Sequence, residues 1–360
     1  MTMRVTIDAT PALLRSAGVK TYTYHWVNHL RRQAGADEIR AFPFLNDFGT
    51  LEHEASTVGP WRTLPRLALI YCFNRTGLPP IDWMLRGSDI FHASNQVRCV
   101  PRHAKLTATL HDLTCWLMPE LHTAANVRAD RGFADSILRR AGGLIAVSEN
   151  TRQDAIRLLG IAPEKIETIY SGVAPEYFEA RATSRARPYV LYVGTIEPRK
   201  NLDTLLDAWR QLRPEFRGSY DLVVAGPHGW RSEKTLARIR AEAAYLGYVP
   251  EADLPGLVAG ATAFVYPSLY EGFGFPVVQA MAAGVAVLTS NTSCLPEIVG
   301  DAALLADPRS AAEIACGLTR LLESESLRDH LAERGRVRAR QFTWENCAAR
   351  SLAFFRRIAG

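Results

Sequence analysis

The segment Pro267–Gly284 constrains the fold more than any other part of the chain. The run before it, Ala263–Pro267, reads as the end of a buried strand, and a glycine-rich turn with one acid leads into a helix that opens at Pro276. Proline suits a first helical turn because its missing N–H is not needed there. The amino end of such a helix favours an anion. The segment therefore predicts a strand–turn–helix unit with an anion site at the turn.

A second loop of the same kind is Gly194–Asn201. It follows the apolar run Tyr189–Val193 and precedes a helical pattern for which Asn201 is a plausible N-cap. Arg199 and Lys200 lie side by side at the expected carboxyl end of a strand, where open α/β sheets bind ligands. Two such cations would neutralise a diphosphate. A solvated turn is the alternative, and the two loops together favour the anion site.

Both loops belong to longer motifs. Those of the second half are GTIEPRKN, VVAGPHGW (Val223–Trp230), LGYVPEADLPGL (Leu246–Leu257), PSLYEGFGFPVVQAMAAG and TSNTSCLPEIVGDAALLADP (Thr289–Pro308). Those of the first half are RSAGVKTYTYHW (Arg15–Trp26), HDLTCWLMPELH (His111–His122), VSENT (Val147–Thr151) and YSGV (Tyr170–Val173). In these motifs the chain resembles the retaining group 1 glycosyltransferases, family 4 of the sequence classification, most of all bacterial polysaccharide mannosyltransferases.

The alternation of strands and helices predicts parallel sheets and an α/β fold. Strands are expected near Arg4–Asp8, Asp89–His92, Leu106–Leu110, Leu144–Val147, Ile166–Ile169, Tyr189, Asp221–Ala225, Ala263–Tyr266, Val285–Thr289 and Ala303–Leu305. The resemblance implies the GT-B fold, in which two Rossmann-like, doubly wound domains face each other across a cleft. We expect an acceptor-binding domain over 1–172, a linker over 173–188 and a nucleotide-sugar domain over 189–341. A C-terminal helix over 342–360 would cross back to the first domain.

Composition agrees with a two-domain enzyme. The 360 residues are 48% hydrophobic and 22% charged, and no apolar run reaches the roughly 18 residues of a membrane span. The amino terminus reads as a first strand and not as a signal peptide. Six scattered cysteines without a CxxC pair favour free thiols in the cytoplasm and give no support to a zinc site.

The net charge of +5 is unevenly distributed. Seven cations gather in the first half, around the apolar run Leu67–Phe73: Arg62, Arg66, Arg75, Arg86, Arg98, Arg102 and Lys105. With Trp61 and Trp83 nearby, this stretch could hold the protein as a peripheral enzyme on the inner face of the cytoplasmic membrane. A core helix with solvated charges on its outer face is the alternative. No nucleic-acid-binding motif is present, and nucleic acid is not an expected partner.

The donor site must stabilise the charge of a departing diphosphate. Metal-dependent glycosyltransferases use an Asp-x-Asp motif, which this chain lacks, so we expect no metal and no cofactor. Arg199 and Lys200 take that catalytic role in the prediction. The other expected donor-binding positions are glycines of the loops and backbone amides of the acid-containing turn: Gly18, Gly194, Gly272, Phe273, Gly274 and Phe275.

Two further donor contacts follow from the resemblance. Glu271 is similar to the glutamate that holds donor-sugar hydroxyls in the family. Eight residues later the family usually has a second glutamate on the ribose, where this chain has Gln279. Glutamine can still accept and donate hydrogen bonds, but it loses roughly 1 kcal/mol of charge assistance. This departure bears on donor affinity and on donor identity.

His111 is the catalytic residue expected from the first domain. It follows the strand Leu106–Leu110, from whose end a side chain can project into the cleft. In the family this histidine bonds the donor sugar near its 6-hydroxyl. A lone histidine is otherwise more often structural, which is the alternative here.

The expected function is transfer of a hexose with retention of configuration by front-face substitution. GDP-mannose is the first choice of donor, and a lipid-linked oligosaccharide of a surface polysaccharide is the expected acceptor. UDP-glucose, another UDP-hexose or a rhamnose donor are alternatives on the same fold. A non-catalytic nucleotide-sugar-binding protein is a further alternative, raised by Gln279.

Overall fold

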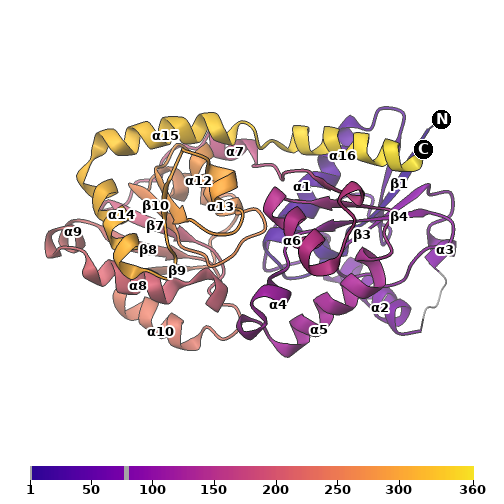
Figure 1. The fold of residues 1–360 in the computed structure, drawn as a ribbon, viewed down its shortest axis with the longest axis horizontal. Helices are drawn as coiled ribbons and strands as arrows, with labels where there is room; N and C mark the ends of the chain where they lie inside the picture. The colour runs from indigo at the N-terminus through magenta and orange to yellow at the C-terminus, as the bar shows by residue number, and fades with distance from the viewer. Residues whose placement is uncertain (1, 77–80) are drawn as a thin grey trace. The chain divides into compact units, whose positions relative to one another are not determined.

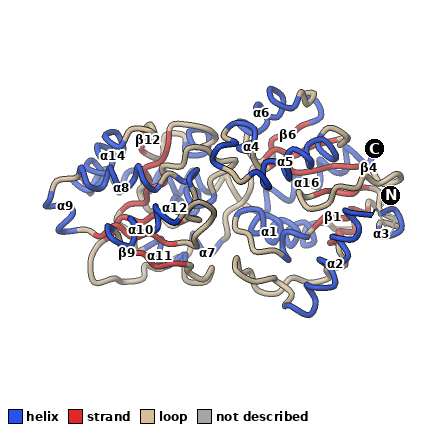
Figure 2. The backbone as a smooth tube through the Cα atoms, turned by 90° about the horizontal axis from the view of Figure 1, so that it is seen from below, coloured by secondary structure: helices blue, strands red, loops and turns tan. Residues whose placement is uncertain are grey.

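The computed structural model describes residues 2–76 and 81–360, which divide into two compact units (Figure 1). Unit 1 comprises Met1–Gly172 and Trp344–Gly360, and unit 2 comprises Val173–Thr343. Each unit has its own six-stranded sheet in which every paired strand is parallel. Figure 2 shows the strands of each unit flanked by helices. The predicted α/β class with two doubly wound sheets is confirmed.

Unit 1 has the strand order β2-β1-β3-β4-β5-β6. Its strands are β1 (Arg4–Asp8), β2 (Glu38–Phe42), β3 (Ile90–Ala93), β4 (Lys105–Leu110), β5 (Gly143–Ala146) and β6 (Ile166–Thr168). Its helices are α1 (Gly18–Gln33), α2 (Pro60–Thr76), α3 (Ile81–Met84), α4 (Thr114–Leu117), α5 (Ala124–Phe133), α6 (Glu149–Leu159) and α16 (Trp344–Ala359). Ser148 caps α6 by accepting the Thr151 amide, and Gly160 ends that helix in the left-handed region.

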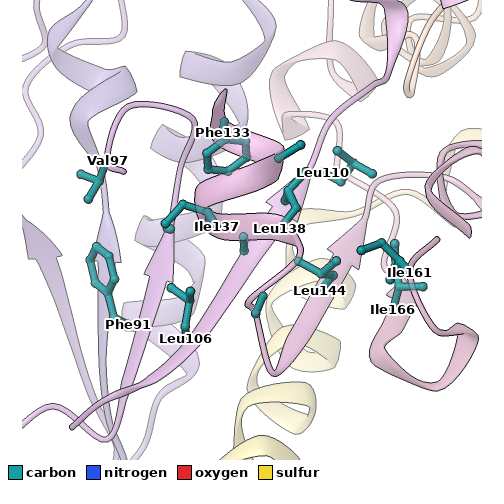
Figure 3. Close-up of a cluster of buried hydrophobic side chains, with 14 of the residues drawn as sticks. Phe91, Val97, Leu106, Leu110, Phe133, Ile137, Leu138, Leu144, Ile161 and Ile166 are labelled. Carbon is teal, nitrogen blue, oxygen red and sulfur yellow. The ribbon is translucent and has the colours of Figure 1, made fainter. Parts of the chain in front are cut away.

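One face of this sheet is covered by a continuous apolar cluster (Figure 3). It joins side chains of β3 to β6 to those of the segment after α5, including Phe91, Leu106, Leu144, Ile137 and Leu138. Strands buried on both faces are nearly all apolar, which is why the sequence revealed them readily.

The last helix, α16, packs against α1 of unit 1. The buried Trp26 indole donates to the Ser351 hydroxyl at 2.9 Å, although the two residues are 325 positions apart. At the far end of the helix, the Lys105 ammonium donates to the carbonyls of Ile358 and Ala359 at 2.8 and 3.0 Å. These bonds fix the middle and the C-terminal end of α16 to the fold formed by the first part of the chain.

Unit 2 has the strand order β12-β11-β10-β7-β8-β9. Its strands are β7 (Tyr189–Val193), β8 (Asp221–Ala225), β9 (Ala244–Gly247), β10 (Ala263–Tyr266), β11 (Val287–Ser290) and β12 (Leu304–Ala306). Its helices are α7 (Pro175–Phe178), α8 (Leu202–Gln211), α9 (Pro214–Ser219), α10 (Glu233–Glu242), α11 (Leu254–Ala259), α12 (Phe275–Ala282), α13 (Leu295–Val299), α14 (Ala311–Glu323) and α15 (Glu325–Ala339).

The segment 173–188, expected as a linker, has structure of its own in unit 2. It contains α7, which contacts α11 and α12, and the Thr183 amide donates to the Gly256 carbonyl at 2.9 Å. Gly256 and Gly260 lie so close to this segment that an added Cβ would come within 2.5–2.6 Å of Thr183. The segment is thus held against unit 2 by backbone contacts that an aperiodic sequence does not reveal.

Two strands were missing from the sequence prediction, and both lie at the edge of a sheet. β2 and β9 each have one neighbouring strand, and every residue of β9 is only partly buried. Charged residues, Glu38 and Arg40, interrupt the apolar run of β2, and no residue of β9 is fully buried, so both carry a weak apolar signal. No helix within residues 2–76 or 81–360 combines the length and the hydropathy that crossing a bilayer requires.

The docking of α16 can be tested at Gly143, on β5. A Cβ there would lie 2.7 Å from Ile358 Cδ1 and 2.9 Å from Phe354 Cζ. We expect Gly143→Ala to lower the free energy of unfolding by about 1–3 kcal/mol, because the added methyl overpacks this contact. Gly142→Ala is the matched control, since its Cβ would meet only the Leu106 carbonyl, at 3.7 Å. Equal stability of the two variants in urea unfolding would contradict the packing of α16 against Gly143.

Candidate functional site: a buried ion cluster in unit 2

Two loops meet at the carboxyl edge of the unit 2 sheet, because β7 and β10 are neighbouring strands. The first loop, Gly194–Asn201, follows β7, and the second, Pro267–Gly274, leads from β10 into α12. The Arg199 carbonyl accepts from the Leu269 amide at 2.9 Å, and its oxygen lies 3.2 Å from the Ser268 hydroxyl oxygen. Strand order reverses between β7 and β10, and such switch points are where open α/β sheets bind ligands.

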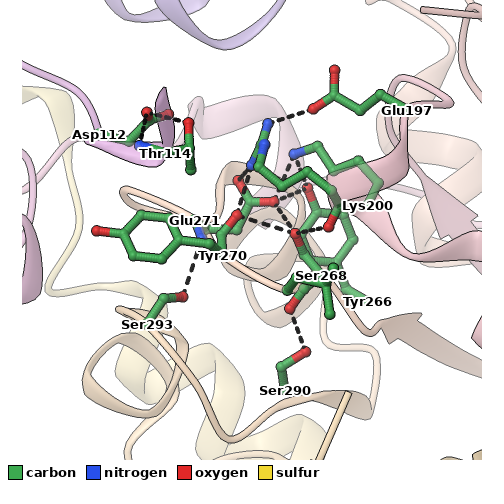
Figure 4. Close-up of polar contacts among 12 residues, drawn as sticks. Asp112, Thr114, Glu197, Lys200, Tyr266, Ser268, Tyr270, Glu271, Ser290 and Ser293 are labelled. Carbon is green, nitrogen blue, oxygen red and sulfur yellow. Dashed lines mark hydrogen bonds and ion pairs between the residues drawn. The ribbon is translucent and has the colours of Figure 1, made fainter. Parts of the chain in front are cut away.

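The predicted catalytic residues of both loops form one ion cluster (Figure 4). Lys200 Nζ lies 2.6 Å from Glu271 Oε1, and an Arg199 guanidinium nitrogen lies 3.1 Å from Glu271 Oε2. The other terminal nitrogen of Arg199 pairs with Glu197 at 2.6 Å. All four side chains are at most 12% exposed. Two cations and two carboxylates therefore balance each other away from bulk water, as buried charges require.

Hydroxyl groups complete the hydrogen bonding around Glu271. Ser268 donates to Glu271 Oε1 at 2.6 Å, and the Tyr266 hydroxyl donates to the same oxygen at 3.1 Å. Lys200 in turn donates to the Tyr266 hydroxyl at 2.6 Å. The Glu271 amide donates to Ser293 Oγ at 3.1 Å, which connects the turn to the segment after β11. The carboxylate is held from several sides, so its position is fixed before any ligand binds.

The electrostatics of the cluster favour an ionised Glu271. Burial alone would raise the pKa of this carboxyl, but the charges of Arg199 and Lys200, with hydrogen bonds from Lys200 and Ser268, bring it down to about 2. Burial is also the main cause that lowers the pKa of the Lys200 ammonium, followed by the charge of Arg199, while Glu271 and Glu197 oppose the shift. The carboxylate–ammonium pair is the form that this geometry supports at neutral pH.

Asn201 follows the cluster but does not cap α8 as predicted. It adopts the left-handed conformation, with φ at 61°, and its side chain accepts no amide of the helix. Its side-chain amide instead donates to the carbonyls of Pro267 and Pro308, at 3.0 and 2.6 Å. Thr204 donates to its carbonyl oxygen at 2.7 Å. Asn201 thus connects the two loops to a third segment, which helix-cap statistics could not predict.

Glycines bring the backbone close together at this edge. Gly226, of the VVAGPHGW motif, has φ at 137°, and a Cβ there would lie 2.1 Å from the Gly194 carbonyl oxygen. Gly274 has φ at 86° and precedes α12, which begins at Phe275, one residue before the predicted start. Gly272 is buried in the same turn.

The Phe273 side chain is buried among other aromatic rings. Its ring is 4% exposed and lies against the rings of Phe275 and Phe342, with centroids 5.2 and 5.6 Å apart. The side chain therefore stabilises the turn, and a donor contact from this residue is left to its backbone amide, as the prediction had it.

The remaining predicted site residues lie elsewhere. Gln279 is on α12, partly exposed, and Gly18 is the exposed first residue of α1 in unit 1. His111 follows β4 of unit 1. Its ring and the Tyr22 ring are nearly perpendicular, with their centroids 4.9 Å apart. Burial lowers the pKa of His111 to about 4, against the opposing charge of Asp112, so the ring is neutral at pH 7.

Sequence reasoning missed Glu197, Tyr266, Ser268 and Ser293 as members of the site. All four lie in the quoted motifs or next to them, but their roles depend on which residues face one another. Glu197 carried a usable signal, because an acid two residues before an Arg–Lys pair at a strand end is placed to orient one of the cations.

The coupling of Glu271 to its cations predicts a pH dependence of stability. The folded pKa of about 2 lies below the ordinary value of 4.5 for a glutamate, so the contribution to stability is present above pH 4.5 and is lost as the pH falls towards 2. We expect Glu271→Gln to lower the free energy of unfolding by about 3 kcal/mol at pH 7, and by roughly half as much at pH 3. Urea unfolding at several pH values measures this difference. Glu333→Gln, at an exposed position in the interior of α15, is the matched control with no expected effect. A loss that does not change with pH would show that the carboxyl is not held ionised by the cluster.

Solved structures resemble the whole chain at low sequence identity. Sucrose-phosphate synthase from Thermosynechococcus elongatus aligns with a TM-score of 0.75 at 19% identity, over 99% of both chains. WaaG, a glycosyltransferase involved in lipopolysaccharide biosynthesis, aligns with a TM-score of 0.70 at 16% identity, over 98% of this chain and 99% of its own. These likenesses establish the GT-B type of fold.

Sequence comparison identifies the family. The model for glycosyl transferases group 1 matches residues 174–338, and the model for Glycosyltransferase Family 4 matches residues 16–177. The O-antigen chain mannosyltransferase B of Escherichia coli is 36% identical over 288 residues, which are 75% of each chain. The serotype-specific mannosyltransferase WbdA of Escherichia coli is 29% identical over 61% of this chain and 29% of its own length. With its two halves matched by the two models, this chain belongs to the group 1 glycosyltransferases.

Proposed function

We propose that this enzyme transfers mannose from GDP-mannose, with retention of configuration, to a lipid-linked oligosaccharide of a bacterial surface polysaccharide. The observation that carries the proposal is the buried cluster of Arg199, Lys200 and Glu271 at the switch point of unit 2. Similarity to an O-antigen mannosyltransferase of Escherichia coli supports mannose as the sugar. So does the 30% identity to an MMP alpha-(1->4)-mannosyltransferase of Mycolicibacterium hassiacum, over 64% of this chain and 58% of that one.

Arg199 and Lys200 would stabilise the departing diphosphate. Both cations now face carboxylates, so the site holds positive charge in a fixed place without a net charge of its own. A diphosphate that enters competes for the two cations, and preorganised donors of this kind lower the barrier to charge separation. Glu197 orients the Arg199 guanidinium and is a positioning residue. We propose that the reaction needs no metal ion.

Glu271 would hold the donor sugar. An ionised carboxylate only accepts hydrogen bonds, and sugar hydroxyls donate them. The depressed pKa of Glu271 keeps it in this accepting form throughout the neutral range. When sugar hydroxyls take over part of the hydrogen bonding to the carboxylate, Lys200 and Arg199 become available for the phosphates.

The transfer itself is proposed as a front-face substitution. The acceptor hydroxyl oxygen bonds to the anomeric carbon while the bond from that carbon to the β-phosphate oxygen breaks, on the same face of the sugar. The acceptor proton passes to the departing phosphate oxygen, so the enzyme forms no covalent intermediate. Neutral His111 would bond a donor-sugar hydroxyl, and Gln279 would bond the ribose.

The proposed acceptor implies that the enzyme acts at the surface of a lipid bilayer. A lipid-linked oligosaccharide is anchored in the membrane, so we propose that the enzyme is a peripheral protein on the inner face of the cytoplasmic membrane. UDP-hexose and rhamnose donors remain the competing candidates, because the cations of the cluster recognise a diphosphate and not a base.

The role of Lys200 is tested by Lys200→Ala. We expect kcat to fall at least about 100-fold, because the departing phosphate loses a preorganised cation. Lys234→Ala removes an exposed cation from α10 and serves as the control. The measurement is steady-state transfer from GDP-mannose to a lipid-linked acceptor, with thermal unfolding to verify that both variants fold. A turnover like that of the unmodified enzyme would contradict the assignment.

Calorimetry of GDP, UDP and dTDP, with and without EDTA, tests the donor. We expect GDP to bind most tightly, in line with the similarity to mannosyltransferases. We expect its affinity to be unaffected by EDTA, because Arg199 and Lys200 supply the positive charge. Preference for UDP or dTDP would keep the fold and reaction class and discard GDP-mannose. Strict dependence on a divalent cation would contradict the metal-free site.

A further inference from the structure

The outer face of α2 in unit 1 exposes large apolar side chains. Trp61 is 88% exposed, Leu64 63% and Tyr71 62%. Their spacing of three and seven residues places them along one side of the helix. On the inner side, Ile70 and Phe73 join the core cluster of the sheet. The alternative of a core helix with solvated charges outside agrees with the buried inner side of α2. It does not account for the aromatic and aliphatic side chains on the outer face.

A further exposed aromatic ring lies on the turn after β2, next to α2. The Arg66 guanidinium donates to the carbonyls of Pro43 and Phe44, each at 3.0 Å, which holds the turn after β2 against α2. The Phe44 ring on this turn is 54% exposed. A cavity of about 480 Å³ is lined by Phe44 and by Met84 of α3, so α3 borders the same region. We call Trp61, Leu64 and Tyr71, which lie on one side of α2, the aromatic face.

Only positive charge accompanies the aromatic face on its helix. Residues 60–76 include Arg62, Arg66 and Arg75 and no Asp or Glu. Arg62 and Arg75 are exposed, and Arg75 donates to the Tyr71 hydroxyl at 2.9 Å. Arginines beside an apolar stripe can reach lipid phosphates while the aromatic rings enter the boundary between headgroups and acyl chains.

We infer that the aromatic face of α2 is the surface by which this enzyme lies on an anionic phospholipid bilayer. The inference deepens the proposed membrane attachment and rests on it for the identity of the partner. Tryptophan and tyrosine are enriched at membrane–water interfaces, where one part of the ring is apolar and the other wet. A row of exposed apolar side chains on a helix whose only charged residues are cations matches a negatively charged surface better than it matches a protein groove with mixed charges.

Vesicle co-sedimentation of the full chain tests the inference. We expect binding to mixed phosphatidylglycerol–phosphatidylcholine vesicles, weaker binding to pure phosphatidylcholine, and a decrease with added salt. Trp61→Ser with Leu64→Ser should weaken binding to the anionic vesicles at least about tenfold, because both side chains leave water on binding. Arg62→Glu should weaken it by about the same factor, through reversal of a charge at the surface.

Matched controls lie on unit 2. Val337→Ser removes an exposed apolar side chain that is 58% exposed, and Arg320→Glu makes the same change of charge at an exposed position of α14. Both should bind vesicles within about twofold of the unmodified protein. Calorimetry of GDP should give the same affinity for all four variants, because none of these residues belongs to the donor site.

Three results would overturn the inference. The unmodified protein could stay in the supernatant with anionic vesicles, bind neutral and anionic vesicles equally, or be weakened no more by the α2 changes than by the controls. The first result would leave a protein partner as the explanation of the exposed rings. Since no donor or acceptor is present, failure here is distinct from failure of the proposed transfer, which the calorimetry and the turnover measurements report separately.

Discussion

The buried pairing of Glu271 with Lys200 and Arg199 is the interaction on which the candidate site depends. Ionised groups leave water at a large cost, which only mutual attraction and complete hydrogen bonding offset. Ser268, Tyr266 and Glu197 supply that completion. The result is a site whose charges are fixed before a ligand arrives. A cluster of this kind suits an enzyme whose leaving group carries its charge on phosphate oxygens.

The parallel sheet explains how residues about 70 positions apart form this cluster. β7 and β10 are adjacent, so the loops that follow them share one edge, and the Arg199 carbonyl joins the two directly. Asn201 adds the Pro308 segment to the same junction. Unit 1 uses the same architecture for different purposes, with His111 at the end of β4 and an apolar outer face on α2.

Much of this could be predicted because local patterns are strong where burial is complete. The central strands and the two loops followed from apolar runs and turn chemistry. β2 and β9 did not, since charged residues interrupt the apolar run of β2 and no residue of β9 is fully buried. The N-cap role predicted for Asn201 was wrong because its side chain bonds the carbonyls of other loops, contacts that lie more than 60 residues away in the chain.

The sequence by itself determined most of the strands, the family and the residue types available to meet a diphosphate, because these follow from local periodicity and from motifs. Only the tertiary structure decided which partners hold them. It pairs Arg199 with Glu197 as well as Glu271, and it turns Ile70 and Phe73 inward while Trp61 and Tyr71 stay outside. A helical stripe specifies that two faces differ, but which apolar face is covered depends on the sheet against which the helix packs.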